Sequence, residues 1–189
     1  MKLSVYKILA LALVSVIAGI ASAQDVYRVN YFSNNNAPGA PDATVRIDNP
    51  GLVYGNLCAM IYVFAADQQL AECCGCVQSH NNLTTYSVGS NLASPFFTLT
   101  ADPVPNGVIK VVSAPYPGYC SPSGPYTPTG TLRVWVTHIQ NKVGSAYPIT
   151  ETESSSSTLG ATELANLQAE CNYLGILGSG YGICNCVSE

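Results

Sequence analysis

The stretch "NLCAMIYVF" at residues 56–64 is apolar at almost every position. A strand with one face in water alternates apolar and polar side chains, whereas a strand buried on both faces is a continuous apolar run. We therefore expect this segment to be a central strand that is covered on both sides.

In shorter segments before and after this stretch, apolar and polar residues alternate. In "ATVRIDNPG" (43–51), Val45 and Ile47 alternate with polar residues and an Asn-Pro-Gly turn follows, which predicts a half-buried strand. Similar runs are "VYRVNYF" (26–32), "LTTYSVG" (83–89), "NGVIKVVSA" (106–114), "TLRVWVTHI" (131–139) and "YPITETES" (147–154). Many short strands rich in Val, Ile, Thr and Tyr, separated by Pro, Gly and Asn turns, predict a mainly β fold, which we expect to be an antiparallel β-sandwich.

One segment has helical periodicity instead. "GATELANLQAECNYLG" (160–175) places Leu164, Leu167, Cys171 and Leu174 on one face, and Gly175 is expected to end the helix. The preceding "SSSST" (154–158) is expected to be a flexible connector. We expect a single C-terminal helix packed on the β domain.

The first 23 residues have the pattern of a signal peptide. Lys2 and Lys7 precede an apolar run at 8–20, and "ASA" (21–23) is a small-residue cleavage signature, so the mature chain is expected to be one domain over 24–189. The apolar run is shorter than the roughly 20 residues a membrane span needs. We expect a secreted protein, extracellular or periplasmic, with no membrane span after cleavage.

The net charge of the expected mature chain limits the classes of partner that it can bind. The five basic and eleven acidic residues left after cleavage give a net charge of −6, without a basic cluster, which argues against nucleic-acid binding.

All eight cysteines lie in the expected mature chain: Cys58, Cys73, Cys74, Cys76, Cys120, Cys171, Cys184 and Cys186. An even number of cysteines in an exported chain predicts disulfides. Bonds between adjacent residues or within C-x-C do not suit disulfide geometry. A Cys73–Cys76 bond is treated as similarly disfavoured, although a tight turn at Gly75 would weaken that step. The three cysteines of "CCGC" (73–76) are therefore expected to bond outside that cluster, and at least one of Cys184 and Cys186 is expected to bond to it.

A metal site is the alternative interpretation of the cluster. Cys73, Cys74, Cys76 and His80 offer thiolate and imidazole ligands for zinc or copper, although structural zinc sites favour C-x₂₋₄-C spacing. A redox centre is a further alternative, but neither C-x-C pair has the C-x-x-C pattern at a helix start. The sequence favours the disulfide framework and assigns no metal or cofactor.

His138 is the alternative candidate for an enzyme. It continues the alternation of Leu132, Val134 and Val136, so we expect a hydrogen-bonded histidine within a sheet. No G-x-S-x-G motif accompanies it. Glu151 and Glu153 share one face of a predicted strand and are expected to be solvated rather than a catalytic pair. No catalytic residue is assigned.

The segment at 113–130, "SAPYPGYCSPSGPYTPTG", contains five prolines and three tyrosines, and predicts a long surface loop that Cys120 tethers. Tyrosines on a rigid loop provide amphipathic contact surface at low entropic cost. A protein or glycan partner is expected there, and homo-assembly through edge strands is a further possibility.

The combination of "LCAMIYVFAADQQLAECCGC", "WVTHIQ", "ITETE" and "GICNC" resembles an uncharacterised family of secreted bacterial proteins with C-C-G-C and C-terminal C-x-C motifs. The resemblance implies export and a shared set of cysteines, and it brings no activity. We therefore expect a non-enzymatic structural or binding protein of the cell surface or extracellular matrix. The alternative is an exported enzyme or metal-binding protein that uses the cluster at 73–76 or His138.

Overall fold

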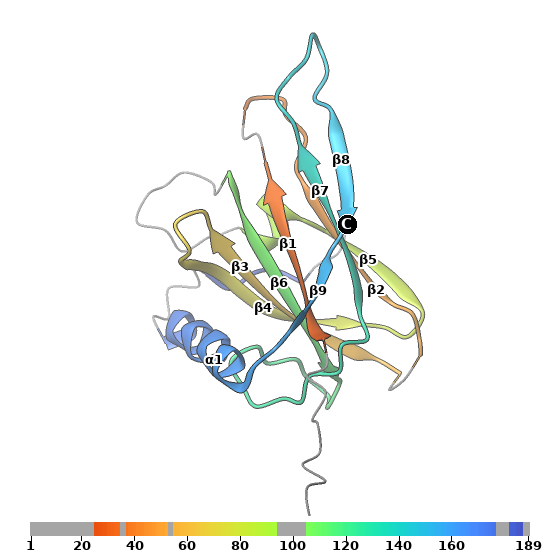
Figure 1. The fold of residues 1–189 in the computed structure, drawn as a ribbon, viewed down its shortest axis with the longest axis vertical. Coiled ribbons are helices and arrows are strands. Elements are labelled where there is room, and N and C mark those ends of the chain that lie inside the picture. Colours follow the sequence, from red (N-terminus) through yellow and green to blue (C-terminus); the bar gives the residue numbers. More distant parts are fainter. Residues whose placement is uncertain (1–24, 35–36, 53–54, 94–104, 177–181, 187–189) are drawn as a thin grey trace, which may run out of the picture.

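The computed structural model describes residues 25–34, 37–52, 55–93, 105–176 and 182–186 (Figure 1). The expected signal peptide and its cleavage site lie outside the described residues. The strands are β1 (Asp25–Ser33), β2 (Thr44–Asn49), β3 (Leu57–Ala65), β4 (Leu70–Gln78), β5 (Asn82–Ser87), β6 (Asn106–Pro115), β7 (Arg133–Ile139), β8 (Ile149–Glu153) and β9 (Ser155–Thr158). A π-helical turn, η1 (Val88–Leu92), follows β5, and the helix α1 (Ala161–Ile176) follows β9.

The strands form one sheet, in the order β4-β3-β6-β1-β7-β2-β5, with β8 paired to β7 and β9 paired to β1. Its neighbours are antiparallel except for β1 and β7, which are parallel and meet at Ser33 and His138. The sheet is therefore mixed, and it curls into a half-barrel (Figure 1). The expected all-antiparallel sandwich is not confirmed. A strongly twisted sheet can bury its own concave face, so alternation along the strands does not distinguish the two arrangements.

The central strand is confirmed. The side chains of β3 alternate between two apolar clusters: Leu57, Ala59, Ile61 and Val63 face the concave core, and Cys58, Met60 and Tyr62 face a second cluster. The second cluster is completed by the buried face of α1, formed by Leu167, Cys171 and Leu174. The fold thus has a core inside the curled sheet and a smaller one between the sheet and the helix.

Two strands were not expected. β4 contains the cysteine cluster and is buried along most of its length, because its side chains alternate between the same two cores. β9 includes most of the serine-rich segment that we expected to be a flexible connector. That expectation is wrong, since Ser155–Thr158 pairs antiparallel with β1 through the backbone.

Other sequence expectations hold. Val45 and Ile47 are fully buried, with Arg46 exposed between them. On the helix, Leu167, Cys171 and Leu174 are buried as expected, whereas Leu164 is half-buried. The helix includes Gly175 and ends one residue later than expected. Over the described ranges, no helix has the length and apolar character that crossing a membrane requires.

Candidate functional site

All eight cysteines are paired in disulfides. The bonds are Cys58–Cys120, Cys73–Cys171, Cys74–Cys184 and Cys76–Cys186. Each cysteine of the cluster bonds outside it, as the geometric argument from the sequence required. Both cysteines of the C-terminal C-x-C motif bond to the cluster, across sequence separations of 110 residues.

Successive side chains of β4 point to opposite faces of the sheet, so these bonds lie on both sides of it. Cys73 faces the helix and bonds to Cys171, whereas Cys74 and Cys76 belong to the concave core. The C-terminal tail lies beside β4 in a parallel bridge between Cys73 and Ile183. At Cys73 the tail thereby occupies the outer edge of β4, where an unpaired strand would be open to pairing with another chain.

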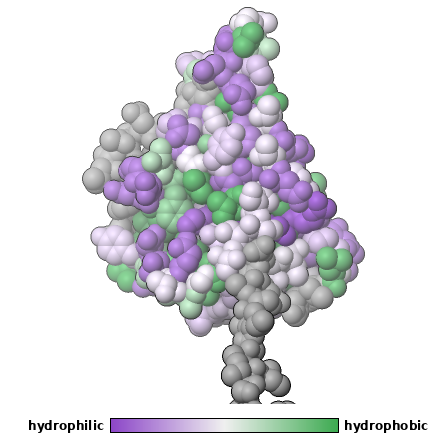
Figure 2. Space-filling model, in the orientation of Figure 1, coloured by the Kyte–Doolittle hydropathy of each residue, from purple (hydrophilic) through white to green (hydrophobic). Residues whose placement is uncertain are grey.

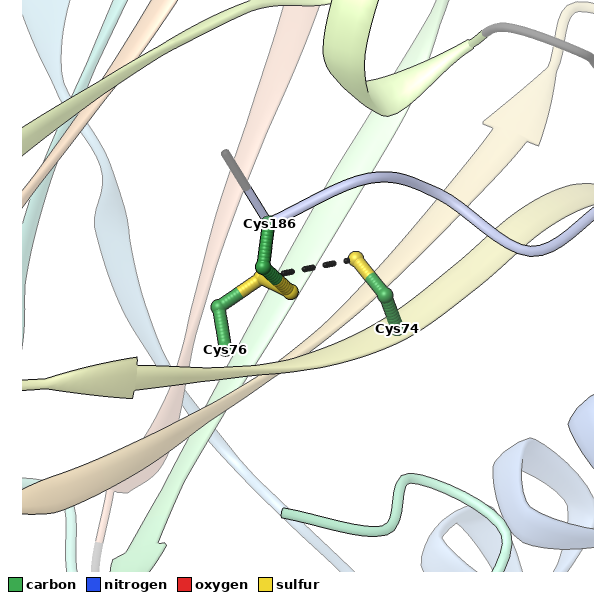
Figure 3. A group of neighbouring side chains, drawn as sticks. All are labelled: Cys74, Cys76 and Cys186. Atoms are coloured by element: carbon green, nitrogen blue, oxygen red, sulfur yellow. Dashed lines mark hydrogen bonds between the residues drawn. A yellow bond between two sulfur atoms is a disulfide. The ribbon is translucent and has the colours of Figure 1, made fainter. Parts of the chain in front are cut away.

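The sulfur atoms of Cys74, Cys76 and Cys186 all lie within 4.8 Å of one another (Figure 3). The Cys74 and Cys76 sulfurs, which are not bonded to each other, are 3.6 Å apart. Cys76 is fully buried and Cys186 is exposed. The two disulfides that join the C-x-C motifs are therefore in direct contact.

The ligand set considered from the sequence is not brought together. Cys73 faces the opposite side of the sheet, and a ring nitrogen of His80, in an exposed turn, lies 3.2 Å from the carbonyl oxygen of Gly51. Cys186 joins Cys74 and Cys76 instead. The matching C-x-C spacing of the two motifs was the sequence signal for this grouping.

His138 is a fully buried histidine of the sheet, as expected. Its Nε2 atom lies 2.8 Å from the hydroxyl oxygen of Thr152, and its ring stacks on that of Tyr31 with centroids 4.0 Å apart. Burial lowers its pKa below the ordinary 6.5. Within the described residues, Nδ1 has no hydrogen-bond partner, so the structure shows no carboxylate orienting this imidazole as a catalytic base.

The glutamates of β8 are surface ion-pair partners. Glu151 lies 3.2 Å from Arg46 of β2, and Glu153 lies 3.0 Å from Arg133 of β7. All five residues of β8 are exposed. This arrangement agrees with a solvated strand face.

Sequence reasoning missed Glu72. This residue of β4 is completely buried, and in the described part of the chain neither carboxylate oxygen has a hydrogen-bond partner. Burial raises its pKa from 4.5 to about 9, because the interior disfavours the charged form. The carboxyl group is therefore protonated at neutral pH.

The tyrosine-rich loop between β6 and β7 is fixed at several points. The hydroxyl of Tyr62 donates to the carbonyl oxygen of Pro122 at 2.6 Å and lies 2.8 Å from the hydroxyl of Tyr126. The side chain of Gln168, on α1, donates to the carbonyl oxygen of Gly124 at 2.7 Å. Together with the Cys58–Cys120 bond, these contacts hold the loop against the sheet and the helix.

The same loop presents aromatic surface. The side chain of Tyr119 is 70% exposed and that of Tyr116 is 37% exposed. A hollow of about 220 Å³ lies beside Tyr119. Its lining includes Met60, Pro115, Pro117, Tyr119, Pro125 and Tyr126.

A larger groove, of about 700 Å³, lies where β1, β3 and β6 run together. Phe64, Val108 and Tyr31 provide apolar lining, and Lys110 lies at the same site. Figure 2 shows apolar residues gathered over the β3 and β6 region, with hydrophilic residues around them.

Comparisons of this chain with protein-family models, with curated proteins and with solved structures found no match.

Proposed function

We propose that the protein is an exported, non-enzymatic binding protein of the cell surface or extracellular matrix, and that the tyrosine-rich loop is its contact surface. The observation that carries the proposal is the combination of a loop anchored on the sheet, the helix and a disulfide with a tyrosine side chain that is 70% exposed at position 119.

The disulfides support the location. Four bonds use every cysteine of the chain, and structural disulfides form and persist in oxidising compartments outside the cytosol. The expected signal peptide agrees with this placement.

Preorganisation supports the role of the loop. A flexible loop loses conformational entropy when it binds, whereas a loop that is already ordered avoids most of that cost. Tyrosine offers a large apolar ring and a polar hydroxyl with few rotatable bonds, which suits both protein surfaces and sugar rings. The hollow beside Tyr119 has room for one side chain or one sugar ring of a partner.

Binding to the surface of the producing cells tests the proposal. Labelled protein is titrated onto isolated envelope and matrix fractions, and the same titration is made with Tyr119→Ala. We expect saturable binding that weakens roughly tenfold or more, as for an exposed aromatic at the centre of an interface. Tyr173→Ala is the matched control, since Tyr173 is a 61% exposed tyrosine on α1, and it should bind like the unmodified protein.

Equal binding by Tyr119→Ala and the unmodified protein would reject the loop as the contact surface. Absence of saturable binding to either fraction would reject the proposed function. Digesting the fractions with a protease or with glycosidases before titration then shows whether the partner is a protein or a glycan.

A further inference from the structure

We propose that the two C-x-C motifs form a tetrahedral four-thiolate site for a thiophilic divalent cation such as Zn²⁺ when their two disulfides are reduced. The ligands are Cys74, Cys76, Cys184 and Cys186. This ligand set differs from the group at Cys73–Cys76 with His80 that was considered from the sequence. It is also independent of the tyrosine-rich loop.

The sulfur atoms already have suitable spacing. A Zn–S bond of about 2.3 Å places the sulfurs of a tetrahedral site about 3.8 Å apart. The unbonded Cys74 and Cys76 sulfurs are 3.6 Å apart, and the Cys186 sulfur lies within 4.8 Å of both. Cys184 is bonded to Cys74, but its sulfur is not one of the three that lie within 4.8 Å of one another. Forming the site therefore requires the two bonded pairs to separate from about 2 Å to about 3.8 Å, and the Cys184 sulfur to move toward those of Cys76 and Cys186.

The spacing of the motifs explains why the sulfurs converge. Residues i and i+2 of an extended chain point to the same side, so Cys74 and Cys76 project together from β4. The tail runs alongside β4 and brings Cys186 to them (Figure 3). The bond from Cys184 to Cys74 joins the second cysteine of the tail to the same strand. Two facing C-x-C motifs thus bring four thiolate ligands together, as two C-x₂-C pairs do in structural zinc sites.

The tail has contacts that survive reduction. The backbone N–H of Cys73 donates to the carbonyl oxygen of Gly182 at 2.9 Å, and that of Cys184 donates to the carbonyl oxygen of Cys73 at 3.2 Å. The N–H of Asn185 donates to the carbonyl oxygen of Asn91 at 2.8 Å. These bonds keep the four thiols together after the sulfur–sulfur bonds open.

Exposure sets the order of reduction. Cys186 is exposed, so an external dithiol reaches the Cys76–Cys186 bond first. Opening that bond frees the end of the tail and gives access to Cys74–Cys184. Cys73 and Cys171 are both 3% exposed or less, which protects the bond between them.

The chemistry balances with two dithiols per chain. Each dithiol transfers two electrons and two protons to one protein disulfide and becomes a disulfide itself. The four resulting thiols release four protons when they bind one Zn²⁺ as thiolates. The tail is then held to β4 by sulfur–sulfur bonds in the oxidised state and by the metal in the reduced state.

The first part of the test follows the thiols. The folded protein is treated with a graded amount of dithiol, and the free thiols are alkylated and mapped by mass spectrometry. We expect a stage at which Cys74, Cys76, Cys184 and Cys186 are alkylated while the Cys73–Cys171 bond persists. Earlier opening of that bond, or unfolding at this stage, would overturn the proposal.

The second part uses Co²⁺ as a spectroscopic probe under anaerobic conditions, after the reductant has been removed. The partly reduced protein should bind one Co²⁺ per chain with the intense visible absorption of a tetrahedral thiolate site, and one equivalent of Zn²⁺ should displace it. The oxidised protein should bind none. Absence of binding by the reduced protein, or an octahedral spectrum, would overturn the proposal.

Matched double variants identify the ligands. Cys184→Ser with Cys186→Ser should abolish the tetrahedral Co²⁺ spectrum, whereas Cys58→Ser with Cys120→Ser removes one disulfide and should leave it intact. Circular dichroism confirms that each variant is folded before the titration. An unchanged Co²⁺ spectrum in the first variant, or its loss in the folded second variant, would show that other residues bind the metal.

Discussion

The backbone carbonyl oxygen of Cys120 occupies the place where Gly75 would carry a side chain. A Cβ atom on Gly75 would lie 2.4 Å from that oxygen and 2.7 Å from the carbonyl carbon. The tyrosine-rich loop therefore packs directly on the backbone of β4, between the two cysteines that bond to the tail. Only glycine at this position allows the loop and the strand to approach so closely.

Gly75→Ala should destabilise the protein, because the extra methyl group meets backbone rather than a movable side chain. We expect a loss of about 1–3 kcal/mol in the free energy of unfolding, as for other overpacked sites. Denaturant titration with the disulfides intact measures it. Gly175→Ala is the control: an added Cβ there has open space within the helix, so it should be neutral or stabilise by up to about 1 kcal/mol. Equal effects of the two substitutions would contradict this account.

Glu72 should make the protein less stable as the pH rises. The buried carboxyl keeps its proton up to a pKa of about 9, whereas in the unfolded chain the pKa is near 4.5. Between these values the native state binds the extra proton, so the free energy of unfolding falls with pH, by at most about 1.4 kcal/mol per unit. Glu72→Gln should remove this slope.

The comparison is cleanest from pH 7 to 9, where histidines no longer titrate. Glu170→Gln is the control, since Glu170 lies on the exposed face of α1, and it should keep the slope of the unmodified protein. If the free energy of unfolding of Glu72→Gln falls with pH as steeply as that of the unmodified protein, Glu72 does not cause the pH dependence.

The parts of the fold that the sequence predicted are those with a local cause. The continuous apolar run of β3 and the alternation around Val45 and Ile47 depend on which faces are buried, and both are confirmed. That the cluster bonds outside itself followed from the short reach between neighbouring cysteines, which is also a local constraint, whereas the individual partners did not follow from the sequence.

The missed features depend on contacts between distant segments. β4 lacks an alternating pattern because both of its faces are buried, one through Cys73 against the helix and the other through Cys74 and Cys76 against the tail. The serines of β9 join the sheet through backbone pairing with β1, to which side-chain type contributes little. The burial of Glu72 likewise follows from the tertiary fold. A glutamate next to two cysteines in the sequence does not indicate that its carboxyl group is buried.

His138→Gln should affect folding more than binding. The substitution removes a fully buried ring stacked on Tyr31 and its contact with Thr152, and we expect a loss of about 1–3 kcal/mol. Because burial lowers the pKa of His138 below 6.5, the unfolded chain binds its proton more readily. Its contribution to stability is therefore lost as the pH falls below 6.5.

Just below pH 6.5 the slope from His138 opposes the slope from Glu72, so His138→Gln is best measured in the Glu72→Gln background. His80→Gln, at an exposed turn, is the control and should change little. A loss of envelope binding with an unchanged melting temperature would contradict the structural role.

Removing the Cys58–Cys120 bond should loosen the tyrosine-rich loop and weaken binding through preorganisation alone. Cys58→Ser with Cys120→Ser opens a link between residues 62 apart in sequence, and loss of a native disulfide costs roughly 2–5 kcal/mol. Every exposed tyrosine remains, so weaker envelope binding by the folded variant reports the cost of ordering the loop. Faster cleavage by a protease within 116–132 would confirm the added mobility. Unchanged affinity together with faster cleavage would show that the rigidity of the loop does not contribute to binding.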